Sequence, residues 1–163
     1  MNKNVIGAIV ISTLLLLTAG IFVSYKISGS AQVEVSQNVK ASLSETRHDW
    51  GNIGINDGKV EKSFFIKNEG TETLKLFNPK TSCMCTTAQI FINGEESPEF
   101  GMHDSSDYVG EVAPGESAEL KAIFDPAFHG PSGTGSITRQ VIVETNDATK
   151  PQLTAVVTAN VIN

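Results

Sequence analysis

Apolar and polar residues alternate along most of the chain from residue 59 onward, with the two-residue period of half-buried β-strands. In the segment 116–126, one face carries Ala118, Leu120, Ala122 and Phe124, and most of the intervening side chains are charged. The segment follows a Pro-Gly turn and ends at a proline, and both features are typical of strand boundaries. The alternation therefore predicts a strand that turns one face toward a core.

Other segments share this pattern. They are 46–51; 59–70, with Val60, Phe64 and Ile66 on one face and Phe65 and Lys67 on the other; 74–79, with Leu74 and Leu76 on one face and an end at Pro79; 137–147, with Ile137, Val141 and Val143; and 153–162, with Leu153, Ala155, Val157, Ala159 and Val161. Short strands separated by turn signals every 8 to 12 residues or so are typical of sandwiches. The predicted fold class is all-β, an antiparallel Ig-like β-sandwich. One segment, 93–116, is too long for a hairpin loop, and long loops in compact domains are often functional.

The N-terminal region has a different pattern. The run from Val5 to Tyr25 is uncharged and apolar, and Lys3 and Lys26 flank it. As a helix it would be about as long as the 30 Å or so of a bilayer's hydrocarbon core. We therefore expect a transmembrane signal anchor or signal peptide in residues 1–27, a polar linker in 28–42, and the sandwich domain in 43–163.

The expected location of the domain is extracytoplasmic, on a single-pass protein of the cell membrane. The alternative is a cleaved signal peptide, because small residues at Gly29, Ser30 and Ala31 resemble a signal peptidase site. Cleavage near Ala31 would give a secreted or periplasmic protein. The apolar run is longer than a usual signal sequence, which favours the anchor.

The exported part is acidic. From Ile27 onward the chain has ten Lys and Arg residues against eighteen Asp and Glu residues, and neither Lys nor Arg occurs between Lys80 and Lys121. Nucleic acid is excluded as an expected partner, because binding its phosphates requires clustered positive charge.

Five segments follow one another along the chain: HDWGNI, FFIKNEGTETLKL, SCMCTTA, VAPGESAELKAIFDP and VIVETND. This succession resembles an uncharacterised bacterial family of exported Ig-like domains, which carries a Cys-Gly-Cys-Thr motif and is related to ASPM/Hydin-type Ig-like domains. Here the motif is Cys83-Met84-Cys85-Thr86, with methionine in place of glycine. The resemblance covers residues 47–162 and implies the Ig-like fold, but it implies no activity.

Cys83 and Cys85 are the chain's two cysteines. A disulfide between them would close a very small loop and so contribute little stability. Thiol–disulfide catalysis is not favoured, because such enzymes lower a cysteine pKa with nearby cations or a helix N-terminus, and residues 81–120 contain no basic side chain. In an extended strand, the two side chains would share one face at about 6.6 Å and could converge on one ion.

A soft-metal site is therefore the preferred interpretation. Thiolates and thioethers select ions such as Cu(I), and Met84 lies between the cysteines. The predicted ligands are Cys83, Cys85 and His129, with Met102 or His103 as further candidates. Zn²⁺ is an alternative if both His103 and His129 contribute. His48 is expected to be structural.

The sequence thus predicts metal handling by a tethered domain, and no enzyme. Phosphate-binding glycine loops and the common hydrolase motifs are absent from the sequence. The expected partners are the metal ion, the membrane through the N-terminal helix, and a protein that exchanges the ion. The competing hypothesis is a structural or protein-interaction Ig-like module, with a Cys-x-Cys disulfide or two idle thiols.

Overall fold

The computed structural model of the chain describes residues 11–15 and 33–163. It divides into two compact units, Met1–Ser30 and Ala31–Asn163. In the first unit, residues 11–15 are helical. Most of the predicted transmembrane segment lies outside the described residues, and among those that are described no helix has the length and apolar character needed to cross a membrane.

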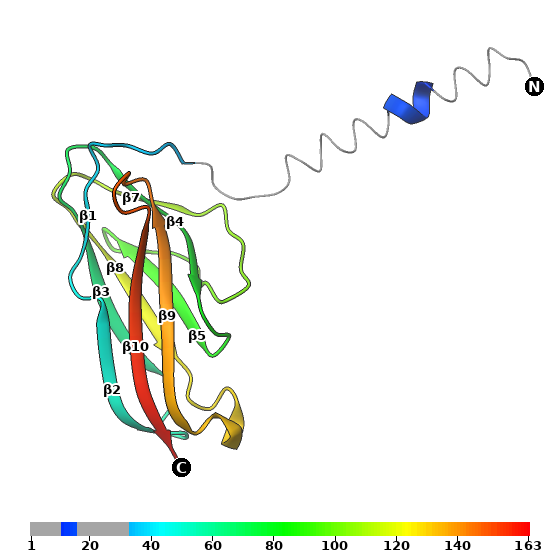
Figure 1. Cartoon of the computed structure of the whole chain (residues 1–163), viewed down its shortest axis with the longest axis vertical. Helices are drawn as coiled ribbons and strands as arrows, with labels where there is room; N and C mark the ends of the chain where they lie inside the picture. Colours follow the sequence, from blue (N-terminus) through cyan, green and yellow to red (C-terminus); the bar gives the residue numbers. More distant parts are fainter. Residues whose placement is uncertain (1–10, 16–32) are drawn as a thin grey trace, which may run out of the picture. The chain divides into compact units, whose positions relative to one another are not determined.

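The second unit is a β-sandwich of two five-stranded sheets (Figure 1). The first sheet has the order β1 (Ala41–Leu43), β3 (Val60–Asn68), β8 (Ser117–Phe124), β5 (Thr86–Ile92) and β6 (Glu95–Glu96). The second has the order β2 (Arg47–Gly54), β10 (Gln152–Ile162), β9 (Gly135–Thr145), β4 (Leu74–Thr81) and β7 (Val109–Val112). One short 3₁₀ helix, η1 (Gly130–Gly133), precedes β9. The predicted sandwich is confirmed.

One strand pair differs from the antiparallel expectation. β2 pairs with β10 in parallel, whereas the remaining named pairs are antiparallel. The chain passes from β1 in the first sheet to β2 in the second and back to β3, so no hairpin joins β2 to its neighbour. A strand without a hairpin connection is free to pair in either direction. Periodicity within a strand carries no information on this choice.

The core forms where the predicted faces meet. Phe64 and Ile66 of β3 and Leu120 of β8 are fully buried, while Phe65 between them is 53% exposed. The same alternation holds in β9 and β10, where Val141, Val143 and their counterparts in β10 are buried. Burial of each large aliphatic or aromatic side chain stabilises the fold by about 1.5 to 3 kcal/mol.

The strand predicted to end at Pro79 continues to Thr81. Asn78 has a positive φ of 47°, and the register of β4 against β9 shifts between Phe77 and Lys80. A bulge of this kind accommodates a proline, because the residue needs no donor in the ladder there. The extra residues of β4 carry the chain to the cysteine pair.

The long segment 93–116 contains two short strands. Asn93 and Gly94, with φ of 52° and 86°, form the turn between β5 and β6, as expected for a tight hairpin. Phe100 is buried and bridges to Ala88. The segment then crosses to the second sheet, where β7 pairs with β4. It therefore connects the two sheets.

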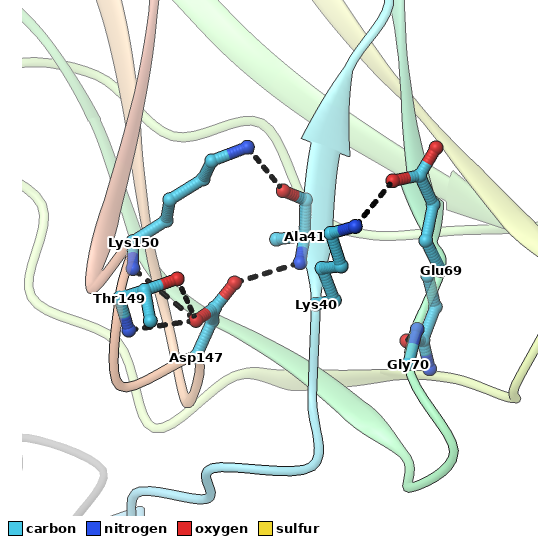
Figure 2. Close-up of polar contacts among 8 residues, drawn as sticks. Lys40, Ala41, Glu69, Gly70, Asp147, Thr149 and Lys150 are labelled. Carbon is cyan, nitrogen blue, oxygen red and sulfur yellow. Dashed lines mark hydrogen bonds and ion pairs between the residues drawn. The ribbon is translucent and has the colours of Figure 1, made fainter.

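The sandwich begins before residue 43, inside the segment expected to be a linker. Ala41 is fully buried, and its backbone N–H donates to Oδ2 of the buried Asp147 over 2.8 Å. Figure 2 shows this carboxylate accepting further hydrogen bonds from Thr149 and Lys150, while Lys150 Nζ donates to the carbonyl of Ala41. The turn between β9 and β10 thus holds the N-terminal strand in place.

Candidate metal centre

Cys83 and Cys85 lie in a tight turn between β4 and β5, and not in an extended strand as expected. The N–H of Thr86 donates to the carbonyl of Cys83 over 3.1 Å. The hydroxyl of Thr81, at the end of β4, donates to the carbonyls of Cys83 and Thr86. A turn brings residues i and i+2 closer than an extended strand does, so the two thiols converge more closely than the sequence predicted.

The Sγ atoms of the two cysteines are 2.7 Å apart, and both are free thiols. His129 Nε2 lies 3.6 Å from the Sγ atom of Cys83. The two sulfurs and one ring nitrogen of His129 all lie within 4.8 Å of one another. The loop after Phe124 therefore folds back over the Cys-x-Cys segment and brings His129 beside the two cysteines.

The His129 loop is attached directly to the cysteine turn. The N–H of Asp125 donates to the carbonyl of Cys85 over 2.9 Å, and the Asp125 carboxylate accepts from the N–H of Ala127. The ring of Phe128 packs edge-on against that of His129, with centroids 5.0 Å apart. These contacts fix the start of the loop relative to the thiols.

The three side chains of the site differ in their exposure to solvent. Cys85 is 2% exposed and packs in the apolar cluster at this end of the sandwich. Cys83 is half-buried, and His129 is exposed. Met84, between the cysteines, is 56% exposed. A molecule from solvent therefore meets Cys83 and His129 before it meets Cys85.

Arg139 lies beside the thiols and was not among the predicted site residues. This residue lies on β9, and its Nε–H donates to the Sγ atom of Cys85 over 3.0 Å, while its Nη1 donates to the carbonyl of Thr138. The conclusion that no cation lies beside the thiols is therefore wrong. The pairing of β4 with β9 brings Arg139 to the site, and the N–H of Ser82 donates to the carbonyl of Gln140. Predicting this contact would have required the register of β4 against β9, which the sequence pattern does not provide.

The two thiols differ in acidity. Burial raises the pKa of Cys83, but hydrogen bonds to Cys85 and His129 and the charge of Arg139 outweigh burial and lower it to about 7. Burial also raises the pKa of Cys85, and the hydrogen bond that Cys85 donates to Cys83 raises it further, against the opposing effect of Arg139. The pair thus favours a thiolate at Cys83 and a proton on Cys85.

One of the remaining predicted ligands, His103, lies outside this group. His103 is not among the described His, Cys, Asp and Glu residues that converge on the site. Met102 is 44% exposed on the same loop, which joins the end of β4 through a hydrogen bond from Thr81 to the carbonyl of Gly101. His48 packs edge-on against Trp50, as expected for a structural histidine.

The geometry of the donors suits one ion after a small adjustment. A sulfur and a nitrogen bound to the same ion at about 2.0 to 2.3 Å lie about 3.6 Å apart, and this is the Cys83–His129 separation. Two bound thiolates lie about 3.8 to 4.0 Å apart, so the cysteine sulfurs would have to separate by about 1 Å. Both cysteines lie in a turn, where side-chain rotation can supply this movement.

Comparisons with known proteins identify the fold and no activity. Residues 41–96 match the model of DUF1573, a protein family of unknown function. This match includes both cysteines but neither His129 nor Arg139. No curated protein matches.

Among solved structures, a protein of unknown function from Porphyromonas gingivalis W83 is 23% identical with a TM-score of 0.58. That match covers 78% of this chain and 49% of that protein, so the chain spans about half its length. The ASH/PapD-like domain 7 of human CEP192 is 14% identical with a TM-score of 0.49, over 84% of this chain and 96% of that one. The chain is therefore similar to DUF1573 over residues 41–96, and its sandwich shares the fold of the Porphyromonas protein.

Proposed function

We propose that the sandwich binds one soft metal ion, Cu(I) foremost, through Cys83, Cys85 and His129, and holds it for handling or delivery without catalysing a reaction. The observation that supports this most directly is the convergence of two sulfurs and an imidazole nitrogen within 4.8 Å. Thiolate and imidazole donors bind Cu(I) and Zn²⁺ in preference to hard ions such as Mg²⁺ and Ca²⁺.

Charge balance favours Cu(I) over Zn²⁺. Two thiolates and one Cu(I) ion carry a net charge of −1, and the guanidinium of Arg139 at Cys85 compensates it. With Zn²⁺ the same group would carry an uncompensated positive charge beside the buried Cys85, and burying net charge costs free energy. Structural zinc sites also use four protein ligands, and the described group supplies three.

The arrangement suits transfer of the ion. His129 is exposed and Cys83 half-buried, so a partner protein could replace these ligands one at a time while Cys85 keeps its bond. Met84 offers an exposed thioether directly beside the site. We therefore propose a protein partner that delivers or accepts the ion.

We further propose that this domain works outside the cytoplasm, tethered to the membrane by residues 1–27 or released by cleavage near Ala31. The support is the uncharged apolar run from Val5 to Tyr25. Membership of the exported Ig-like family with the Cys-Gly-Cys-Thr motif, and the relation to ASPM/Hydin-type domains, form part of the same proposal.

The test is an anaerobic Cu(I) titration of the reduced full chain in mild detergent, against a chromogenic Cu(I) chelator. We expect one ion per chain. Cys83→Ser and Cys85→Ser should each abolish binding, because a single thiolate remains and no other thiolate can replace the lost one, and His129→Ala should weaken it less. His103→Ala is the matched control and should leave affinity unchanged, because His103 lies outside the group.

Full copper stoichiometry in the Cys83→Ser, Cys85→Ser double variant would rule out this site. The structural or protein-interaction module would then be the better account. A parallel titration with Zn²⁺ decides between the two ions, since the charge argument expects weaker Zn²⁺ binding that strengthens in Arg139→Gln.

A further inference from the structure

The cysteine pair has a second chemical capacity, which does not require a metal. Its sulfurs are 2.7 Å apart, both are free, and they sit in a turn that holds them against each other. A disulfide requires about 2.05 Å between sulfurs, so only a small movement separates the dithiol from the bonded pair. We infer that Cys83 and Cys85 undergo thiol–disulfide exchange with external disulfides, with Cys83 reacting first and Cys85 resolving.

The order of reaction follows from exposure. Cys83 is half-buried and borders solvent, whereas Cys85 is 2% exposed inside the apolar cluster. An external disulfide can therefore reach the Sγ atom of Cys83 but not that of Cys85. Cys85 in turn has Cys83 within reach, so its only accessible electrophile is the mixed disulfide formed there.

Two neighbouring side chains stabilise the charges that arise. His129 Nε2 lies 3.6 Å from the Cys83 sulfur, where it can donate to a thiolate. The Nε–H of Arg139 points at the Cys85 sulfur over 3.0 Å, where it stabilises the thiolate that must form before resolution. Each sulfur thus has its own donor, as exchange in two steps requires.

The proposed reaction is balanced. The Cys83 thiolate attacks one sulfur of the external disulfide; a bond to Cys83 forms, the external S–S bond breaks, and the first thiolate leaves and takes a proton. Cys85 then loses its proton to solvent and attacks the Cys83 sulfur. The Cys83–Cys85 bond forms, the mixed disulfide breaks, and the second thiolate leaves and is protonated. Two electrons pass from the protein to the external disulfide, which is reduced to two thiols.

The test uses oxidised glutathione as the probe on the metal-free, reduced full chain in mild detergent, with acid quenching and mass spectrometry of the intact chain. Wild type should form an internal disulfide without accumulating a glutathione adduct. Cys85→Ser should accumulate a stable adduct on Cys83. Cys83→Ser should react at least ten-fold more slowly, because Cys85 is buried, and should react readily once denatured by urea.

Two results would overturn the inference: equal native-state reactivity of Cys83→Ser and Cys85→Ser, or a wild-type chain that keeps two alkylatable thiols after incubation. Because metal is absent throughout, exchange and ion binding are tested separately, and either can fail alone. His129→Phe keeps both thiols and provides a second measurement, since loss of the donor should slow formation of the Cys83 adduct in the Cys85→Ser background.

Discussion

Arg139 donates its Nε–H to the sulfur of Cys85 over 3.0 Å, across 54 residues of sequence. This contact places a permanent positive charge against the buried member of the cysteine pair. In its absence, a thiolate at Cys85 would be buried without a compensating charge, which is strongly unfavourable. The arginine therefore makes the deprotonated pair attainable, whether the sulfurs bind an ion or exchange electrons.

The first prediction concerns the reactivity of Cys83. Its pKa is lowered to about 7, so alkylation by iodoacetamide should reach half its maximal rate near that pH. His129→Ala should move the midpoint upward, because the hydrogen bond to His129 favours the thiolate. Arg139→Gln should raise the midpoint by less, because Arg139 donates its hydrogen bond to Cys85 and affects Cys83 only through its charge. Lys67→Gln removes the same charge from β3 and serves as the control, with no expected shift.

A second prediction concerns the carboxylate that holds β1. Oδ1 of Asp147 accepts from Thr149 and Lys150, and Oδ2 accepts from Ala41. In Asp147→Asn, an NH₂ group replaces one carboxylate oxygen. This NH₂ group, itself a hydrogen-bond donor, would face the backbone N–H groups that now donate to the carboxylate. We expect the free energy of unfolding to fall by about 1 to 3 kcal/mol, measured by urea denaturation. Asp49→Asn, whose carboxylate accepts from Gly51 at the surface, should cost less.

The third prediction is the pH dependence of the same contact. Burial raises the pKa of Asp147, but four hydrogen bonds outweigh burial, and the folded-state pKa is lowered from 3.8. A lowered folded-state pKa means that the stabilisation is complete above the unfolded pKa and is lost as the pH falls below it. Between about pH 6 and about pH 3, wild type should therefore lose more stability than Asp147→Asn. Equal losses in both chains would show that Asp147 does not carry this dependence.

The fourth prediction tests the close packing of Gly70 against the N-terminal strand. A Cβ atom on Gly70 would lie 2.4 Å from the carbonyl oxygen of Asn38 and 2.6 Å from the N atom of Lys40. Both atoms are backbone, so Gly70→Ala must displace the chain before β1. We expect faster proteolysis at residues 36–43 and a lower melting temperature. Gly101→Ala is the control, because its new Cβ would meet only the Asp104 side chain, at 3.3 Å.

The sequence was sufficient for the sandwich because burial follows alternation within each strand. The buried faces of β3, β8, β9 and β10 are those that the apolar residues predicted. It was not sufficient for properties that depend on how strands pair. The parallel direction of β2, the continuation of β4 beyond Pro79 and the sandwich residues before Leu43 all follow from pairing between distant segments.

The candidate metal site also combines features that the sequence could predict with features that depend on strand pairing. His129 could be proposed as a ligand from the sequence, because it follows the end of a predicted strand in a loop rich in glycine and proline. The turn at Cys83 and the arrival of Arg139 could not, since both depend on the register of β4 against β9. The absence of Lys and Arg from residues 81–120 was a poor guide to the charge around the cysteines in space.

The strand β9 also separates the cysteine pair from the turn that holds β1. Arg139, in the half of β9 nearer η1, contacts Cys85, while Thr145, the last residue of β9, contacts Asp147, which holds β1. The six residue steps between them span about 20 Å of rigid strand. A molecule that reaches the thiols therefore need not disturb the hydrogen bonds by which Asp147 holds β1, so chemistry at the cysteine pair and the anchoring of the first strand are spatially independent.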